Sequence, residues 1–140
     1  MRIWAYELID VLPKKQLLAM RYELGDMIKQ YPNIKHGLVK FANNYDIASL
    51  GKYYTEVIFE ICKRGYNFNK KYDETLIELI KNKSKNLLDN KRYKEDDDRY
   101  LKQCYFNLQE KFDRKIITEE EWKLIESKFK KQIEVSKDVD

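Results

Sequence analysis

The chain has 140 residues, which is enough for one domain with its own hydrophobic core. Its composition, 43% hydrophobic and 37% charged with only 4 Gly and 2 Pro, is typical of a helical protein and excludes a disordered chain and a turn-rich β protein. The net charge of +4 permits a nucleic-acid partner without requiring one.

A first helix is predicted between Pro13 and Pro32. Proline suits the first helical turn, because its missing N–H has no partner there, and a second proline stops the helix. Apolar residues recur between them at steps of three and four and form one stripe: Leu17, Met20, Leu24, Met27 and Tyr31. Glu23 lies one residue from Leu24 and therefore about 100° around the helix, which predicts a position at the flank of the buried stripe.

A second helix is predicted from Asp46, which is a suitable N-cap. Its buried face consists of apolar residues at helical spacing: Ile47, Leu50, Tyr54, Val57, Ile58 and Ile61. Lys63, Arg64 and Gly65 predict its end, because cations favour the negative end of a helix dipole and glycine favours the left-handed cap.

Three more helices complete the pattern. Asp73 is predicted to cap a third helix that runs to Leu87. The fourth presents the apolar face Tyr100, Leu101, Cys104, Tyr105, Leu108 and Phe112. Thr118 and Glu121 have the spacing of a capping box and precede the fifth, with Trp122, Ile125, Phe129 and Ile133.

These elements predict an all-α fold, a compact single-domain bundle of about five helices over residues 1–135, with a disordered tail at 136–140. Glu7 and Asp10 interrupt any early apolar run, so we expect no signal peptide. No segment reaches the roughly 18 apolar residues of a membrane span. Cys62 and Cys104 lack CxxC spacing, and we expect both to be buried thiols of a cytoplasmic protein.

The motifs that are missing restrict the chemistry. The sequence has no P-loop, no GxGxxG and no HExxH, and His36 is its one histidine. With two distant cysteines, a zinc site is not expected. We therefore expect no metal and no organic cofactor, and an enzyme built on this chain has to use carboxylates and amines.

Several segments, in order and spacing, are similar to the pyrimidine-dimer DNA glycosylases. They are the start, Met1-Arg2-Ile3; the stretch from Gln16 to Leu24, with its Arg-Tyr-Glu-Leu end; the pair Lys35-His36; and Glu60 to Asn67, which contains Lys-Arg-Gly-Tyr-Asn. The stretch from Asp97 to Leu108 looks like a later helix of bacterial relatives. The first half of the chain carries most of the resemblance.

The resemblance implies a DNA repair glycosylase with abasic-site lyase activity. The N-terminal α-amine, here on Met1, would form an imine with the sugar beneath a damaged base, since the amine has a reference pKa of about 7.7–8.0 and is partly neutral at physiological pH. Glu23 would be the carboxylate that stabilises the cationic sugar and moves protons. The implied DNA-binding residues are Arg2, Arg21, Lys35, His36, Lys63 and Arg64. The implied partner is damaged double-stranded DNA, bound by a monomer.

Other functions stay open. Arg2 is too large for ordinary removal of the initiator Met, so Met1 is expected to remain. Tyr22 stands where the phage enzyme of the family has arginine, and Asp26 falls near a further arginine of the family. These differences motivate an alternative, a non-catalytic nucleic-acid-binding protein that retains the glycosylase fold. A third possibility is a helical interaction module whose basic charge is incidental.

Overall fold

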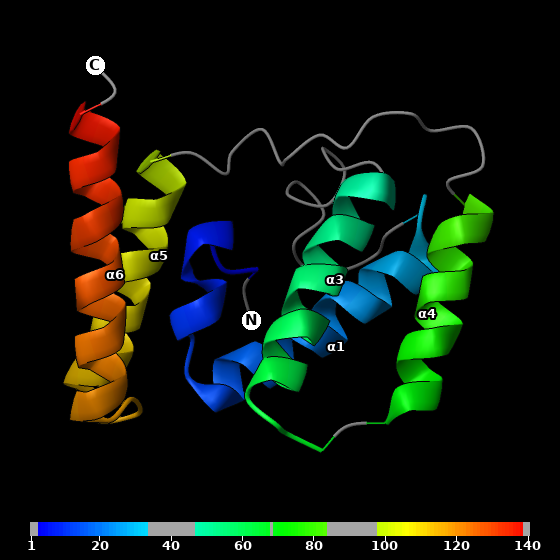
Figure 1. Cartoon of the computed structure of the whole chain (residues 1–140), viewed down its shortest axis with the longest axis horizontal. Helices are drawn as coiled ribbons and strands as arrows, with labels where there is room; N and C mark the ends of the chain where they lie inside the picture. Colours follow the sequence, from blue (N-terminus) through cyan, green and yellow to red (C-terminus); the bar gives the residue numbers. More distant parts are fainter. Residues whose placement is uncertain (1–2, 34–46, 68, 84–97, 139–140) are drawn as a thin grey trace. The chain divides into compact units, whose positions relative to one another are not determined.

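The computed structural model describes residues 3–33, 47–67, 69–83 and 98–138, the stretch 135–138 by its backbone alone. Every regular element within these ranges is a helix, which confirms the all-α prediction (Figure 1). The elements are the 3-10 helix η1 (Tyr6–Val11) and the α-helices α1 (Lys14–Gln30), α3 (Ile47–Lys63), α4 (Lys70–Lys83), α5 (Asp98–Asp113) and α6 (Glu119–Asp138). None of the helices in the described part has the length and apolar character that a bilayer crossing requires.

The chain divides into two compact units. The first unit comprises Met1–Ile3 and Leu18–Lys94, and the second comprises Trp4–Leu17 and Glu95–Asp140. The boundary falls within α1, so the single domain over residues 1–135 stays a prediction. Each unit has buried apolar side chains of its own.

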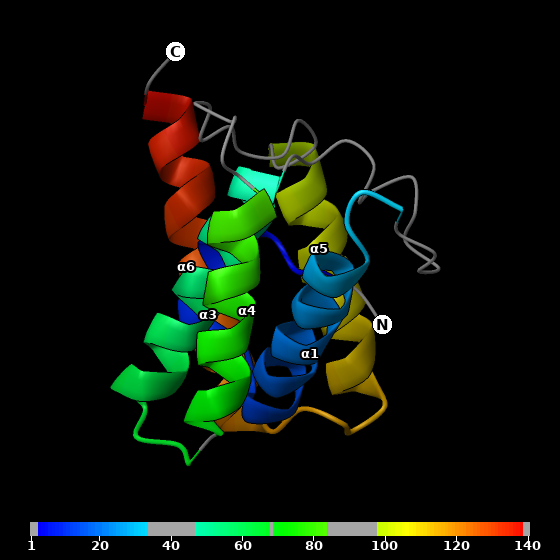
Figure 2. The same cartoon turned by 90° about the vertical axis from the view of Figure 1, so that its right-hand side faces the viewer.

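In the first unit, α3 and α4 pack against each other (Figure 2). Two glycines permit close approach between helices. A Cβ added at Gly51 would lie 2.8 Å from Ile80 Cγ2, and one added at Gly25 would overlap the Tyr72 hydroxyl. The fully buried apolar side chains of this unit include Ile3, Met20, Leu24, Met27, Ile28, Ile47, Leu50, Tyr54, Val57, Ile61 and Leu76.

The ends of the helices show which local signals operate. In α3, the N–H of Gly65 donates to the carbonyl of Cys62 and the N–H of Tyr66 to that of Ile61, with φ +74° at Gly65. This is the Schellman pattern, and it confirms the predicted end of the helix. The predicted cap Asp46 and the predicted terminal residue Leu87 lie outside the described residues.

The predicted cap of α4 is wrong. Asn69 caps this helix, since its Oδ1 accepts hydrogen bonds from the N–H groups of Lys71 (3.0 Å) and Tyr72 (3.4 Å). Asp73 lies inside the first turn and is buried, with its side chain directed to a partner on α1. At its other end, α4 carries Lys83, whose Nζ donates to three carbonyls at the end of α1, those of Ile28, Lys29 and Tyr31.

The second unit contains η1, α5 and α6, and α6 packs against both of the others. Aromatic rings hold α5 to α6: Tyr105 stacks on Phe129 with centroids 3.9 Å apart, and Phe112 stacks on Trp122 at 5.3 Å. The Nζ of Lys128 pairs with Asp10 of η1 at 3.0 Å.

The capping box before α6 is confirmed. The N–H of Thr118 donates to Glu121 Oε1 (2.9 Å), and the N–H of Glu121 donates to Thr118 Oγ1 (3.2 Å). The helix continues to Asp138, into the segment for which a disordered tail is predicted. Cys104 is buried as expected, but Cys62 is exposed on α3, so the prediction for Cys62 is wrong.

Candidate functional site

Glu23 lies on α1 and is 7% exposed. The sequence predicted Glu23 at the flank of the buried stripe, but the structure places it among the buried residues. The residue sits beside Leu24 and one turn from Met20 and Met27, which are all fully buried. Glutamate is among the residues that are almost never fully buried in proteins unless they are paired, because desolvation disfavours its charge. A carboxylate kept in such a place is a candidate for chemistry.

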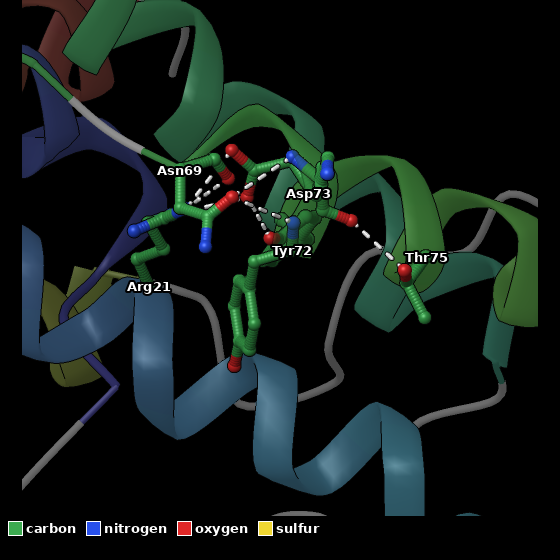
Figure 3. A network of polar contacts seen from close by, with 7 residues as sticks. Arg21, Asn69, Tyr72, Asp73 and Thr75 are labelled. Atoms are coloured by element: carbon green, nitrogen blue, oxygen red, sulfur yellow. Dashed lines mark hydrogen bonds and ion pairs between the residues drawn. The ribbon is translucent and has the colours of Figure 1, made fainter.

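Arg21, two residues earlier, is 2% exposed and is held by Asp73 of α4 (Figure 3). Its Nε donates to Asp73 Oδ1 at 3.1 Å and its Nη2 to Asp73 Oδ2 at 3.0 Å. The Nη2 also donates to the backbone carbonyl of Asn69 at 3.3 Å. Two parallel N–H···O bonds make this the bidentate geometry that fixes both position and orientation.

Tyr54 of α3 completes the network, since its hydroxyl donates to Asp73 Oδ1. Burial and this hydrogen bond raise the pKa of Tyr54 well above its ordinary value. Burial alone would lower the pKa of Arg21, but the charge and hydrogen bonds of Asp73 outweigh it, and the pKa of Arg21 is raised. The network therefore holds a protonated arginine and a neutral tyrosine, and it ties α1 to both α3 and α4.

An aromatic pair flanks the guanidinium of Arg21. Its Cζ lies 5.2 Å from the ring centroid of Tyr22 and 5.0 Å from that of Tyr72. The two rings are in tilted contact, with centroids 5.6 Å apart. Lys29 places its Nζ 4.7 Å from the centroid of Tyr72. Burial and the negative charge of Asp26 raise the pKa of Tyr72.

The two basic residues at the end of α3 differ from each other. Lys63 is exposed. Arg64 is partly buried and pairs with Glu60 one turn earlier, with Nε and Oε1 2.9 Å apart, and its Cζ lies 6.0 Å from the ring centroid of Tyr66.

The structure describes some of the predicted site residues and not others. Arg21 and Glu23 share α1 but differ by about 200° around its axis, so they serve different sides of the helix. Met1, Arg2, Lys35 and His36 lie outside the described residues. No group of three or more residues suited to a metal ion occurs in the described ranges.

Three residues of the network were not predicted as partners of Arg21 or as site residues: Tyr54, Asn69 and Asp73. One signal was available. Asp73 lies three residues before Leu76 and seven before Ile80, so it shares the buried face of α4. An acidic residue on an apolar face predicts a buried partner better than it predicts a cap.

The fold and these residues define an all-helical protein with a buried glutamate on a helix that a buried ion pair fixes in place. A family model described as pyrimidine dimer DNA glycosylase matches residues 1–74. This is more than half of the chain, and the chain belongs to that family. The matched segment includes Arg21, Glu23 and Asp73. Comparison with curated proteins finds no match, and neither does comparison with solved structures.

Proposed function

We propose that the protein is a DNA repair glycosylase with abasic-site lyase activity, in which the α-amine of Met1 and the carboxylate of Glu23 carry the reaction. The observation that carries the proposal is the burial of Glu23 within the segment matched by the family. The ion pair of Arg21 with Asp73 supports it, because a reacting group acts efficiently only when its scaffold is rigid.

The chemistry follows from the two groups. The neutral amine donates its electron pair to the sugar carbon beneath the damaged base, and the bond from that carbon to the base breaks. Loss of an amine proton and opening of the sugar ring give the imine. The carboxylate stabilises the positive charge that develops on the sugar and accepts the proton whose removal lets the 3′ phosphate leave by β-elimination. Extrusion of a nucleotide from the duplex gives access to the sugar.

Basic residues provide the binding surface in this proposal. Arg2, Lys35, His36 and Lys63 contact phosphates, and Arg64 does so from its pair with Glu60. The burial of Arg21 favours a positioning role on α1 over a phosphate contact. The protein acts as a cytoplasmic monomer and uses no cofactor.

The test is reduction by borohydride in the presence of a duplex with one abasic site, using protein with a native N-terminus. The reduced imine is expected to give a stable protein–DNA adduct on a denaturing gel. Peptide mapping is expected to show that the DNA is attached to Met1. Glu23→Gln is expected to reduce strand cleavage by about 100-fold or more, the usual contribution of a positioned acid–base group, while duplex binding persists. Glu74→Gln, at an exposed position of α4, is the matched control. Cleavage by Glu23→Gln at the rate of the control would refute the role of Glu23.

The second candidate is a non-catalytic DNA-binding protein with the same fold, favoured by the exposed Tyr22 and Asp26 beside the candidate glutamate. It predicts no adduct but binding that weakens steeply as salt rises, since phosphate contacts release counterions. Binding that is absent or independent of salt would leave the helical interaction module.

A further inference from the structure

Tyr22 presents an aromatic ring to solvent on the candidate catalytic helix. Its side chain is 53% exposed, although it lies between the buried residues Arg21 and Glu23. A single exposed apolar residue needs no explanation. Tyr22, however, does not stand alone, because its ring contacts Tyr72 and lies against the guanidinium of Arg21.

The residues beneath this ring have partners of their own. Tyr72 crosses from α4 to α1 (Figure 3). Its hydroxyl fits there because Gly25 has no side chain. Arg21 is fixed by two hydrogen bonds to Asp73. Because the groups behind Tyr22 already have these partners, a ligand that stacks on its exposed part does not have to arrange them.

The same face of α1 carries two charged side chains. Asp26 and Lys29 follow Tyr22 by four and seven residues, so the three lie within about 60° around the helix, and all are exposed. A carboxylate can accept a hydrogen bond from the exocyclic amine of a base, and an ammonium group binds phosphate. By the same angular count, Glu23 lies about 60° beyond Asp26, so this exposed face of α1 borders the proposed reaction centre.

We propose that Tyr22, supported by Tyr72, is a stacking platform for an unpaired nucleobase of the DNA duplex, with Asp26 at the base edge and Lys29 at the backbone. Aromatic rings with nearby cations are the groups on which proteins stack unpaired bases. The inference rests on the proposed function in that it takes DNA as the substrate. It adds a group that recognises the base, whereas the amine and Glu23 act on the sugar.

The experiment compares two duplexes that cannot form an imine. One contains a tetrahydrofuran abasic analogue opposite an unpaired adenine, and the other is fully paired. The measured quantity is the ratio of their dissociation constants, by fluorescence anisotropy at fixed salt. Wild type is expected to prefer the unpaired base, and Tyr22→Ala to reduce that preference about tenfold, within the range known for loss of base stacking. Tyr22→Phe is expected to retain it.

Tyr22→Leu keeps apolar bulk without an aromatic face, and circular dichroism of each variant reports its fold. An unchanged preference in both Tyr22→Ala and Tyr22→Leu would overturn the inference, as would a wild type without any preference. Borohydride trapping on a true abasic site separates this result from the proposed function. If an adduct forms but the preference does not depend on Tyr22, the lyase activity is retained as a proposal and the stacking platform is refuted. If the preference depends on Tyr22 but no adduct forms, the stacking platform is retained and the lyase activity is refuted.

Discussion

Both units of the molecule have buried apolar side chains, but they differ in the further contacts that join their helices. In the first, a buried arginine, aspartate and tyrosine join three helices through hydrogen bonds with defined directions. In the second, aromatic rings join α5 to α6: Tyr105 on Phe129, and Phe112 on Trp122. Apolar contacts stabilise without strict direction, whereas a bidentate ion pair also fixes orientation.

This difference corresponds to the distribution of the candidate site. Glu23 and Tyr22 lie in the first unit, on the helix that Asp73 holds through Arg21. Replacement of a buried ion pair by apolar residues often costs little stability, so stability alone does not explain such a pair. The polar network of the first unit therefore orients α1, because its two parallel hydrogen bonds fix direction as well as position.

The largest effect is expected from removal of Asp73. Asp73→Ala leaves Arg21 buried without its carboxylate, and we expect the free energy of unfolding of the first unit to fall by about 3–5 kcal/mol. Urea unfolding measures the loss, and Glu74→Ala at the exposed neighbouring position is the control. The double variant Arg21→Met, Asp73→Leu should recover part of that stability. A loss below about 1 kcal/mol for Asp73→Ala would show that the pair does not hold the unit.

Tyr54→Phe should have a smaller effect that depends on pH. The hydroxyl donates to a carboxylate, so its removal should cost roughly 1.5–3 kcal/mol near neutral pH. Because the folded protein raises the pKa of Tyr54, the folded state keeps a proton that the unfolded state releases above about pH 10. The stability that this hydroxyl provides is therefore complete below that pH and declines as pH rises further. The difference in the free energy of unfolding between wild type and Tyr54→Phe should be complete at about pH 8 and smaller at about pH 11. A difference that is the same at both pH values would contradict the hydrogen bond assigned to Tyr54.

The contrast between the units also shows what the sequence could predict. The end of α3 at Gly65 and the capping box of Thr118 with Glu121 were predicted, because each signal and its partner lie within a few residues. The partner of Asp73 is 52 residues away, so the local pattern suggested a cap where the fold has an ion pair. Periodicity gave the angle of Glu23 on α1, but burial depends on segments that are distant in the chain.

The residues of the candidate site differ in how far local sequence determines their environment. Glu23 and Arg21 were selected by resemblance, and periodicity placed Glu23 beside the apolar stripe of α1. Their different environments follow from tertiary partners, since Asp73 lies on another helix. The platform at Tyr22 was not predicted either, because its support combines Tyr72 with the space left by Gly25.

The smallest expected effect concerns the local signal that was predicted correctly. Thr118→Ala removes the oxygen that accepts the N–H of Glu121, and we expect a loss of about 1 kcal/mol in the second unit. Thr75→Ala is the matched control, because the hydroxyl of Thr75 bonds to the carbonyl of Lys71 inside α4 and alanine favours a helix interior. Hydrogen exchange at the amide of Glu121 should accelerate in Thr118→Ala and stay unchanged in the control. A cap acts over one turn, whereas the Arg21–Asp73 pair joins separate helices. Hydrogen exchange at the buried residues of α3 should therefore respond to Asp73→Ala and not to Thr118→Ala. Equal responses there would show that the two units unfold as one, and that the contrast between them is one of composition and not of stability.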